Sequence, residues 1–105
     1  MRLNLNLLTR VAKRSKREHR HASIIFKNGT PRTFGFNGTE HHAEENAMVR
    51  DKNYKGAVMV NIRLTKAGKI GMAKPCPGCL DLLKEKKFRK VIYSTNHGTF
   101  EEIYL

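Results

Sequence analysis

The sequence predicts a single α/β domain that spans residues 1–105, and three observations lead to this fold class. A chain of 105 residues has the size of one small domain. Hydrophobic residues make up 39% of it, which is enough for a core. Segments with helix-like and strand-like patterns alternate in the order helix, strand, strand, helix, strand, helix, strand, and a short strand follows at the end.

The first half of the chain predicts a helix, a hairpin and a second helix. Asn6 is a suitable N-cap for a basic amphipathic helix, because apolar residues recur after it at near-helical spacing. Residues 23–27 and 32–36 have the composition of strands, and the Asn-Gly-Thr-Pro turn signal at 28–31 joins them into a hairpin. The next helix is predicted over 43–50.

The second half predicts two further strands around one helix. Residues 57–64 are rich in Val, Met and Ile and indicate a largely buried strand. A turn at 66–69 interrupts the extended chain, which resumes at 70–73. A proline suits the first turn of a helix predicted over 77–87, and a strand follows at 91–94.

The direction of the last strand, predicted over 99–105, follows from the length of its connection. An Asn-His-Gly turn signal at 96–98 separates it from the preceding strand. A parallel return needs a crossover of a dozen or more residues, and none fits there. The last two strands are therefore predicted to pair antiparallel.

The chain is strongly basic, with 21 Lys and Arg against nine Asp and Glu and a formal net charge of +12. A charge of this size attracts polyanions at long range, so phosphate is an expected part of the ligand. The candidate contacts for it are Lys84, Lys86, Lys87, Arg89 and Lys90. The alternative is that basic side chains only keep a small protein in solution.

The chain has no apolar stretch long enough to span a membrane, and its start lacks the apolar segment of a secretory signal. These features predict a soluble, cytoplasmic protein. Two cysteines separated by two residues, in a reducing compartment, are more often metal-binding or redox-active than a structural disulfide.

Two short motifs carry chemistry, and each lies at the start of a predicted helix. The first is His42-Ala43-Glu44, and the second runs from Pro75 to Cys79 with the sequence Pro-Cys-Pro-Gly-Cys. Helix N-termini favour negative charge, which suits thiolate ligands. His42, Cys76 and Cys79 would leave the fourth position of a tetrahedral zinc site open to water, as catalytic zinc sites do. Glu44 is the candidate carboxylate that accepts and redelivers the proton of that water.

An HxE motif followed by PCxxC is the signature of zinc nucleobase deaminases. On the basis of this signature, the sequence resembles the cytidine and deoxycytidylate deaminase superfamily over residues 35–95. Residues 35–38, Gly-Phe-Asn-Gly, are similar to the GYNG element of deoxycytidylate deaminases, and residues 42–47, His-Ala-Glu-Glu-Asn-Ala, are similar to their HAExNA element. Residues 75–79 complete the resemblance.

The resemblance implies a three-layer α-β-α fold with a central sheet of about five strands. It also implies hydrolytic deamination of a cytosine base, in cytidine, deoxycytidine or a nucleotide, to uracil with release of ammonia. By the resemblance, the zinc ligands are His42, Cys76 and Cys79, and the catalytic glutamate is Glu44. Asn37 would contact the sugar, and the backbone at Ala43 and Lys74 would flank the base.

Two departures leave the substrate open within the superfamily. The loop from Gly38 to His42 is too short for the nucleotide-contacting insertion of deoxycytidylate deaminases, and the C-terminus lacks their last helix and parallel strand. The antiparallel ending is more similar to free-cytidine deaminases, many of which build active sites across subunit contacts, so a homo-oligomer is implied. The alternative is a cytosine deaminase that acts on single-stranded DNA or RNA. Enzymes that deaminate adenine share the same signature, so adenine is also a possible substrate base.

The same motifs permit other interpretations. The cysteine pair alone could be redox-active, although His42 and Glu44 would then have no role. A structural zinc site would need a fourth ligand, and His41 or His97 could supply it. A zinc-stabilised module that docks its basic helix on nucleic acid is a third alternative, against which the intact Glu44 speaks. Glu45 would share the face of His42 on an ideal helix better than Glu44, and only the family pattern favours Glu44.

Overall fold

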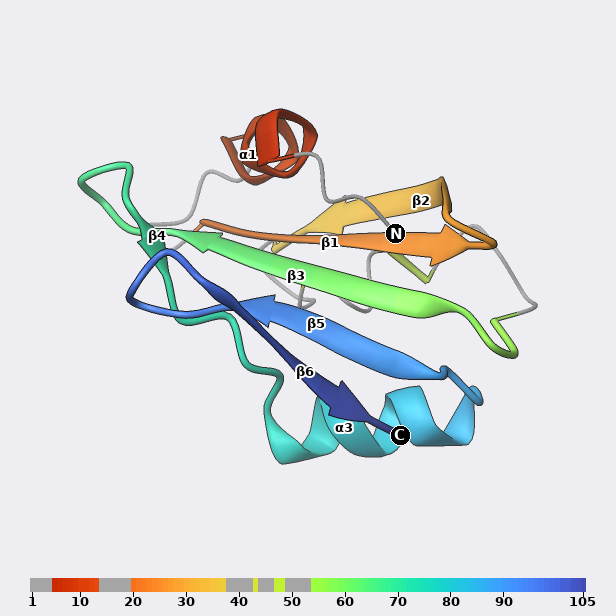
Figure 1. The fold of residues 1–105 in the computed structure, drawn as a ribbon. Helices are drawn as coiled ribbons and strands as arrows, with labels where there is room; N and C mark the ends of the chain where they lie inside the picture. The colour runs from red at the N-terminus through yellow and green to blue at the C-terminus, as the bar shows by residue number, and fades with distance from the viewer. Residues whose placement is uncertain (1–4, 14–19, 38–42, 44–46, 49–53) are drawn as a thin grey trace.

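The computed structural model of residues 1–105 describes most of the chain, namely residues 5–13, 20–37, 43, 47–48 and 54–105. One mixed sheet occupies the middle of the molecule, and helices pack on both of its faces (Figure 1). Among the described residues, no helix is long and apolar enough to cross a membrane.

Five strands of the sheet run side by side in the order β2-β1-β3-β5-β6, and β4 pairs with β3 beside this path. In chain order they are β1 (Arg20–Lys27), β2 (Thr30–Phe36), β3 (Val58–Leu64), β4 (Ile70–Gly71), β5 (Lys90–Ser94) and β6 (Phe100–Tyr104). Among the described strands, only β3 and β5 pair in parallel. The antiparallel pairing of β5 with β6 confirms the prediction from the length of their connection.

A tight turn makes β1 and β2 a hairpin. Asn28 and Gly29 both have positive φ, at 53° and 77°, which is the backbone of a type I′ turn and suits the twist of the two strands. The predicted start of the first strand at residue 23 is wrong by three residues. Arg20 and His21 extend β1 because their backbones pair with Leu64 and Arg63 of β3, whatever the polarity of their side chains.

Alternate residues of the strands point into two cores, one on each face of the sheet. On one face α1 (Leu5–Lys13) packs Leu8 and Val11 against Ile24 and Ile62. On the other face α3 (Pro77–Glu85) packs Leu83 against a second cluster, which includes Ala47 of the segment around residues 43–48. Helical chain on both faces of a central sheet confirms the three-layer α-β-α prediction.

The helix α3 ends two residues earlier than predicted. It ends at Glu85 because Lys87 adopts a positive φ of 64°, which no α-helix accommodates. The amide of Lys86 still donates to the carbonyl of Leu82 at 3.0 Å and closes the last turn. Phe88 then enters the second cluster, where its ring stacks on that of Tyr54 at a centroid distance of 5.4 Å.

A side-chain hydrogen bond links β5 to β6 and predicts a pH dependence of stability. The hydroxyl of the buried Tyr93 donates to Oε2 of Glu101 at 2.9 Å. This hydrogen bond, then burial and then the charge of Glu101 raise the pKa of Tyr93 above its usual value. Its contribution to stability is therefore complete below about pH 10, the pKa of an unfolded tyrosine, and is lost as the pH rises through the higher folded pKa.

We expect Tyr93→Phe to remove this part of the alkaline fall in stability, measured as the urea midpoint between neutral and strongly alkaline pH. Glu101→Gln keeps an acceptor but removes the charge, so the pKa of Tyr93 is raised less, and the fall in stability should be smaller and should end at lower pH than in the parent protein. A midpoint profile identical for the parent and Tyr93→Phe would show that the hydrogen bond does not contribute.

Candidate active site at the start of α3

The two cysteines lie where an extended segment turns into α3. Cys76 is the N-cap, with extended backbone at φ −67° and ψ 163°, and Pro77 takes the first helical position. The amide of Cys79 donates to Sγ of Cys76 at 3.4 Å, and the amide of Leu80 donates to the carbonyl of Cys76 at 3.0 Å. The first turn of α3 thus forms around the first thiol.

Neither cysteine forms a disulfide, and the two thiols differ in exposure. Cys76 is exposed, whereas Cys79 is 6% exposed and faces the protein. A sulfur that accepts a backbone N–H, at the positive end of a helix, is in the environment of a thiolate metal ligand. No acidic residue lies in the first turn of α3 to oppose negative charge there. This donor set suits zinc, which takes two thiolates at CxxC spacing in many sites.

The position of the site in the sheet is that of ligand sites in α/β proteins. β3 and β5 run in parallel, and the segment from Gly71 to Cys76 passes their carboxyl ends before α3 begins (Figure 1). Ligands of open α/β sheets bind at this end of parallel strands. The thiols therefore lie at the end of the sheet where chemistry is expected.

Two residues that the sequence analysis did not select hold this segment in place. The hydroxyl of the fully buried Ser94 donates to the carbonyl of Gly71 at 2.7 Å, and the carbonyl of Ser94 accepts from the amide of Ala73 at 2.9 Å. Oδ1 of Asn96 accepts from the amide of Met72 at 2.8 Å. The predicted end of this strand at residue 73 is therefore wrong: β4 ends at Gly71 because these hydrogen bonds take the next residues to Ser94 and Asn96.

We expect Ser94→Ala to lower the free energy of unfolding by about 1–3 kcal/mol, because it leaves the carbonyl of Gly71 buried without this donor. It should also weaken zinc binding, since the chain that carries Cys76 loses an anchor. The matched control is Ser23→Ala, since Ser23 is also fully buried but its hydroxyl donates to Oδ1 of Asn61, at 2.7 Å, away from the thiols. Urea unfolding and zinc competition titrations measure both quantities; equal zinc affinity in both variants would contradict the anchor role.

Asn37, the predicted sugar contact, lies at the same end of the sheet. Its Oδ1 accepts from the amide of His21 at 3.0 Å, and its own amide donates to the carbonyl of His21 at 3.2 Å. His21 pairs with Arg63 of β3, which in turn pairs with Gly71 at the start of the thiol segment. Asn37 therefore fastens the end of β2 to β1, a structural role that the turn-like Gly-Phe-Asn-Gly sequence did not reveal.

The other predicted site residues are described only in part. Ala43 is helical and buried, and Lys74 is exposed two residues before Cys76. His42 and Glu44 lie outside the described residues. Within the part of the chain that the structure describes, no three His, Cys, Asp or Glu side chains come together as a metal site. The third zinc ligand and the proton carrier therefore stay predictions.

The basic cluster predicted to bind phosphate lies away from the thiols. The residues Lys84, Lys86, Lys87, Arg89 and Lys90 belong to the end of α3 and the start of β5. The nine residues of α3 span about 13 Å between them and Cys76. The backbone of the cluster is therefore separated from Cys76 by most of the length of α3.

The sequence matches none of the protein-family models and no curated protein sequence. Solved structures do match. RibD of Acinetobacter baumannii aligns in its forms 1 and 2 with TM-scores of 0.67 and 0.64, at 20% and 19% identity. Each alignment covers 86% of this chain and 26% of the RibD chain, so this chain spans about a quarter of the RibD length.

A second kind of match is dCMP deaminase from the cyanophage S-TIM5 in its apo form, with a TM-score of 0.61 and 24% identity over 86% of this chain and 75% of that one. The chain has a deaminase-type fold. The fold class that the resemblance implied is confirmed, and the cysteine pair lies in this deaminase-type fold at the carboxyl ends of its parallel strands.

Proposed function

We propose that this protein is a zinc-dependent hydrolytic deaminase of a cytosine base, in a nucleoside or nucleotide. The observation that carries the proposal is the turn at Cys76 and Cys79. It places two thiols outside any disulfide at the N-terminus of α3 and at the carboxyl ends of β3 and β5, in a deaminase-type fold. Cys76, Cys79 and His42 would hold the metal. When bound, zinc supplies a water whose pKa falls from 15.7 toward about 7.

The protein side chains then have distinct roles in this proposal. Glu44 takes the proton of the attacking water, delivers it to N3 of the base and passes a second proton to the departing amine at C4, so that ammonia leaves and uracil remains. Asn37 orients the sugar, and the backbone at Ala43 and Lys74 flanks the base. Asn37 is suited to this role because the bonds to His21 fix its position.

A nucleoside is the preferred form of the substrate. The basic cluster around Lys87 lies at the far end of α3 from Cys76, and the exposed Lys74 is the nearest cation to Cys76 in sequence. We propose further that the protein is cytoplasmic and forms a homo-oligomer. Sedimentation of the purified protein tests the latter.

Ammonia release from a panel of substrates tests the proposal. Zinc-loaded protein is incubated with cytidine, deoxycytidine, their monophosphates, adenosine and a cytosine-containing single strand. We expect release from cytidine or deoxycytidine, at a rate that changes little with added salt. The variant Cys79→Ser should lose both bound zinc and turnover. Fully zinc-loaded protein that releases no ammonia from any of these substrates would exclude the proposed activity.

A further inference from the structure

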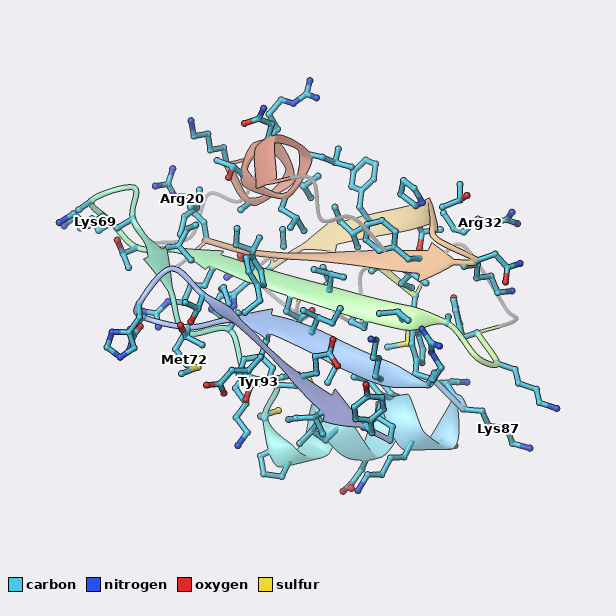
Figure 2. The ribbon with its side chains drawn as sticks, viewed as in Figure 1. Arg20, Arg32, Lys69, Met72, Lys87 and Tyr93 are labelled. Atoms are coloured by element: carbon cyan, nitrogen blue, oxygen red, sulfur yellow. The ribbon has the colours of Figure 1, made fainter. Side chains whose placement is uncertain are left out.

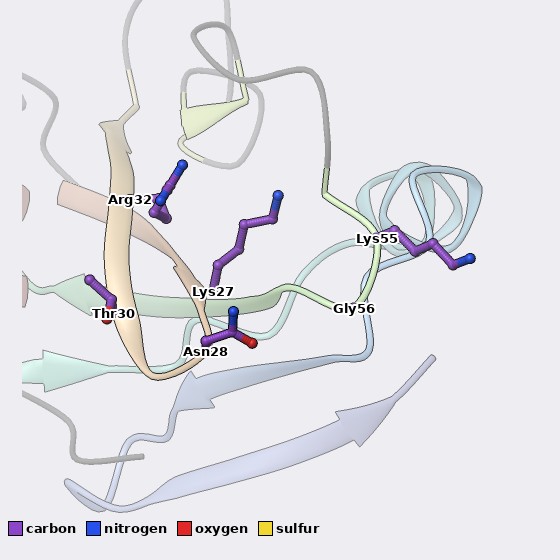
Figure 3. A pocket seen from close by; sticks show the side chains of 6 residues that line it. All are labelled: Lys27, Asn28, Thr30, Arg32, Lys55 and Gly56. Atoms are coloured by element: carbon purple, nitrogen blue, oxygen red, sulfur yellow. The ribbon is translucent and has the colours of Figure 1, made fainter.

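A basic hollow lies at the end of the sheet opposite the thiols. It has a volume of about 500 Å³ and is lined by Lys27, Asn28, Thr30, Arg32, Lys55 and Gly56 (Figure 3). Figure 3 shows the side chains of Lys27 and Arg32 extending to the same side of the hairpin, from the end of β1 and from β2, whereas the ammonium group of Lys55 points away. Of the described residues that line it, three are cationic and none is acidic.

The hollow lies at one end of a longer basic surface, called the basic edge below, which crosses the ends of the strands. Phe26, Val58, Lys90 and Tyr104 form one row across β1, β3, β5 and β6, because each pairs with the next. Neighbouring strands are about 4.8 Å apart, so this row is about 14 Å long. Lys27 follows Phe26 at one end of the row, and the exposed Arg89 precedes Lys90.

Backbone hydrogen bonds join the hollow to the rest of this edge. The amide of Gly56, which lines the hollow, donates to the carbonyl of Lys87 at 2.9 Å. The amide of Arg89 donates to the carbonyl of Ala57 at 2.8 Å. The exposed cations Lys87 and Arg89 are therefore held beside the rim of the hollow by the fold itself.

An exposed aromatic ring lies at the far end of the same row. Tyr104 is 71% exposed, and Nζ of Lys90 lies 5.6 Å from the centre of its ring. Lys90 also pairs with Glu102 at 3.1 Å, so the carboxylate of Glu102 already has a cationic partner. Cations together with an exposed ring are the two elements of surfaces that bind single strands, where phosphates pair with cations and bases stack on aromatic faces.

We propose that this edge binds the phosphodiester backbone of single-stranded nucleic acid, with one phosphate in the hollow between Lys27 and Arg32 and a base on Tyr104. The hollow and the ring are too far apart for a single phosphate to use both, and a polymer of phosphates uses the cations between them. The seven residues of β3 place this edge about 20 Å from the thiol end of the sheet. Binding here is therefore independent of the proposed deamination.

Fluorescence anisotropy with a labelled oligothymidine tests the proposal, because thymine has no exocyclic amine to remove. The double variant Lys27→Gln/Arg32→Gln should bind at least about tenfold more weakly at low salt. The slope of log affinity against log salt should become shallower by about 0.7, since the hollow holds one phosphate and each phosphate contact on a single strand contributes about 0.7. Tyr104→Ala should weaken binding by about tenfold and leave that slope unchanged.

The matched control is Lys66→Gln/Lys69→Gln, which removes the same charge at the other end of the sheet. Figure 2 shows Lys69 and Arg32 at opposite ends of the molecule, and both control lysines are exposed in the turn after β3. The control should bind oligothymidine as the parent protein does. Circular dichroism and urea midpoints verify that every variant is folded.

Three results would overturn the proposal. The first is equal weakening in the two double variants, which would mean that only net charge matters. The second is no binding of oligothymidine at low salt by the folded parent protein. The third is binding to vesicles of an anionic phospholipid, or to inorganic phosphate alone, that depends on Lys27 and Arg32 while oligothymidine does not compete.

Discussion

Glu44→Gln is expected to lower turnover of the best cytosine substrate by about 10² to 10⁴, with zinc content unchanged. The amide has nearly the size of the carboxylate but cannot accept the proton of the attacking water or return it to the base. Because the amide adds no zinc ligand and removes none, metal analysis should give the same stoichiometry as in the parent protein. Steady-state ammonia release and elemental analysis on one preparation measure both effects.

Glu45→Gln is the control that separates the two adjacent glutamates. It removes the same charge at the neighbouring position, so any general effect of charge on substrate or metal binding is shared. We expect it to retain most of the turnover. If Glu45→Gln abolishes turnover and Glu44→Gln does not, the assignment by the family pattern is wrong and the position favoured by ideal helix geometry is right.

Leu83→Ala should cause the largest loss of stability among single changes in α3. Leu83 is fully buried in the cluster with Met59 and Val91, and it joins α3 to the sheet one turn after Cys79. Replacing a buried leucine by alanine costs about 2–5 kcal/mol, from lost apolar contact and from the cavity that remains. Domains of this size have a total stability of about 5–15 kcal/mol, so the urea midpoint should fall markedly.

Lys84→Ala is the matched control for this prediction. Lys84 is the next residue along α3 and is exposed, so its truncation should change the free energy of unfolding by no more than about 0.5 kcal/mol. Leu83→Ala should also lower the affinity for zinc, whereas Lys84→Ala should not, because the position of Cys79 depends on the packing of α3 against the sheet. A Leu83→Ala protein as stable as Lys84→Ala would show that α3 is held by other contacts.

Local patterns made most of the fold predictable. The run rich in Val, Met and Ile at residues 57–64 predicted a largely buried strand, and the structure divides β3 between two cores, with Val58 and Val60 in one and Met59 in the other. The ends of elements were less predictable, because partners distant in sequence decide them. Arg20 belongs to β1 because its backbone pairs with that of Leu64. Met72 lies outside β4, and its amide donates to the side chain of Asn96.

The same contrast holds for the candidate site. The turn from Cys76 to Cys79 could be predicted because its four consecutive residues belong to one helix start and need no partner that is distant in sequence. Ser94 could not, because its hydroxyl acts on the carbonyl of Gly71, 23 residues earlier, and a serine at the end of an apolar strand has no distinguishing pattern. The separation of the basic cluster from the thiols could also be predicted, because the cysteines begin α3 and Lys84 lies in its last turn.

The border strand β2 determines how copies of this chain can meet. Pro31 cannot donate a backbone hydrogen bond, Arg32 carries a charge, and an irregular register opposite Ile25 and Phe26 interrupts the pairing. Unpaired edge strands are the sites at which sheets of different molecules pair and at which amyloid fibrils grow. Association of copies through β2 should therefore be disfavoured, and even concentrated solutions should resist amyloid-type polymerisation along this border.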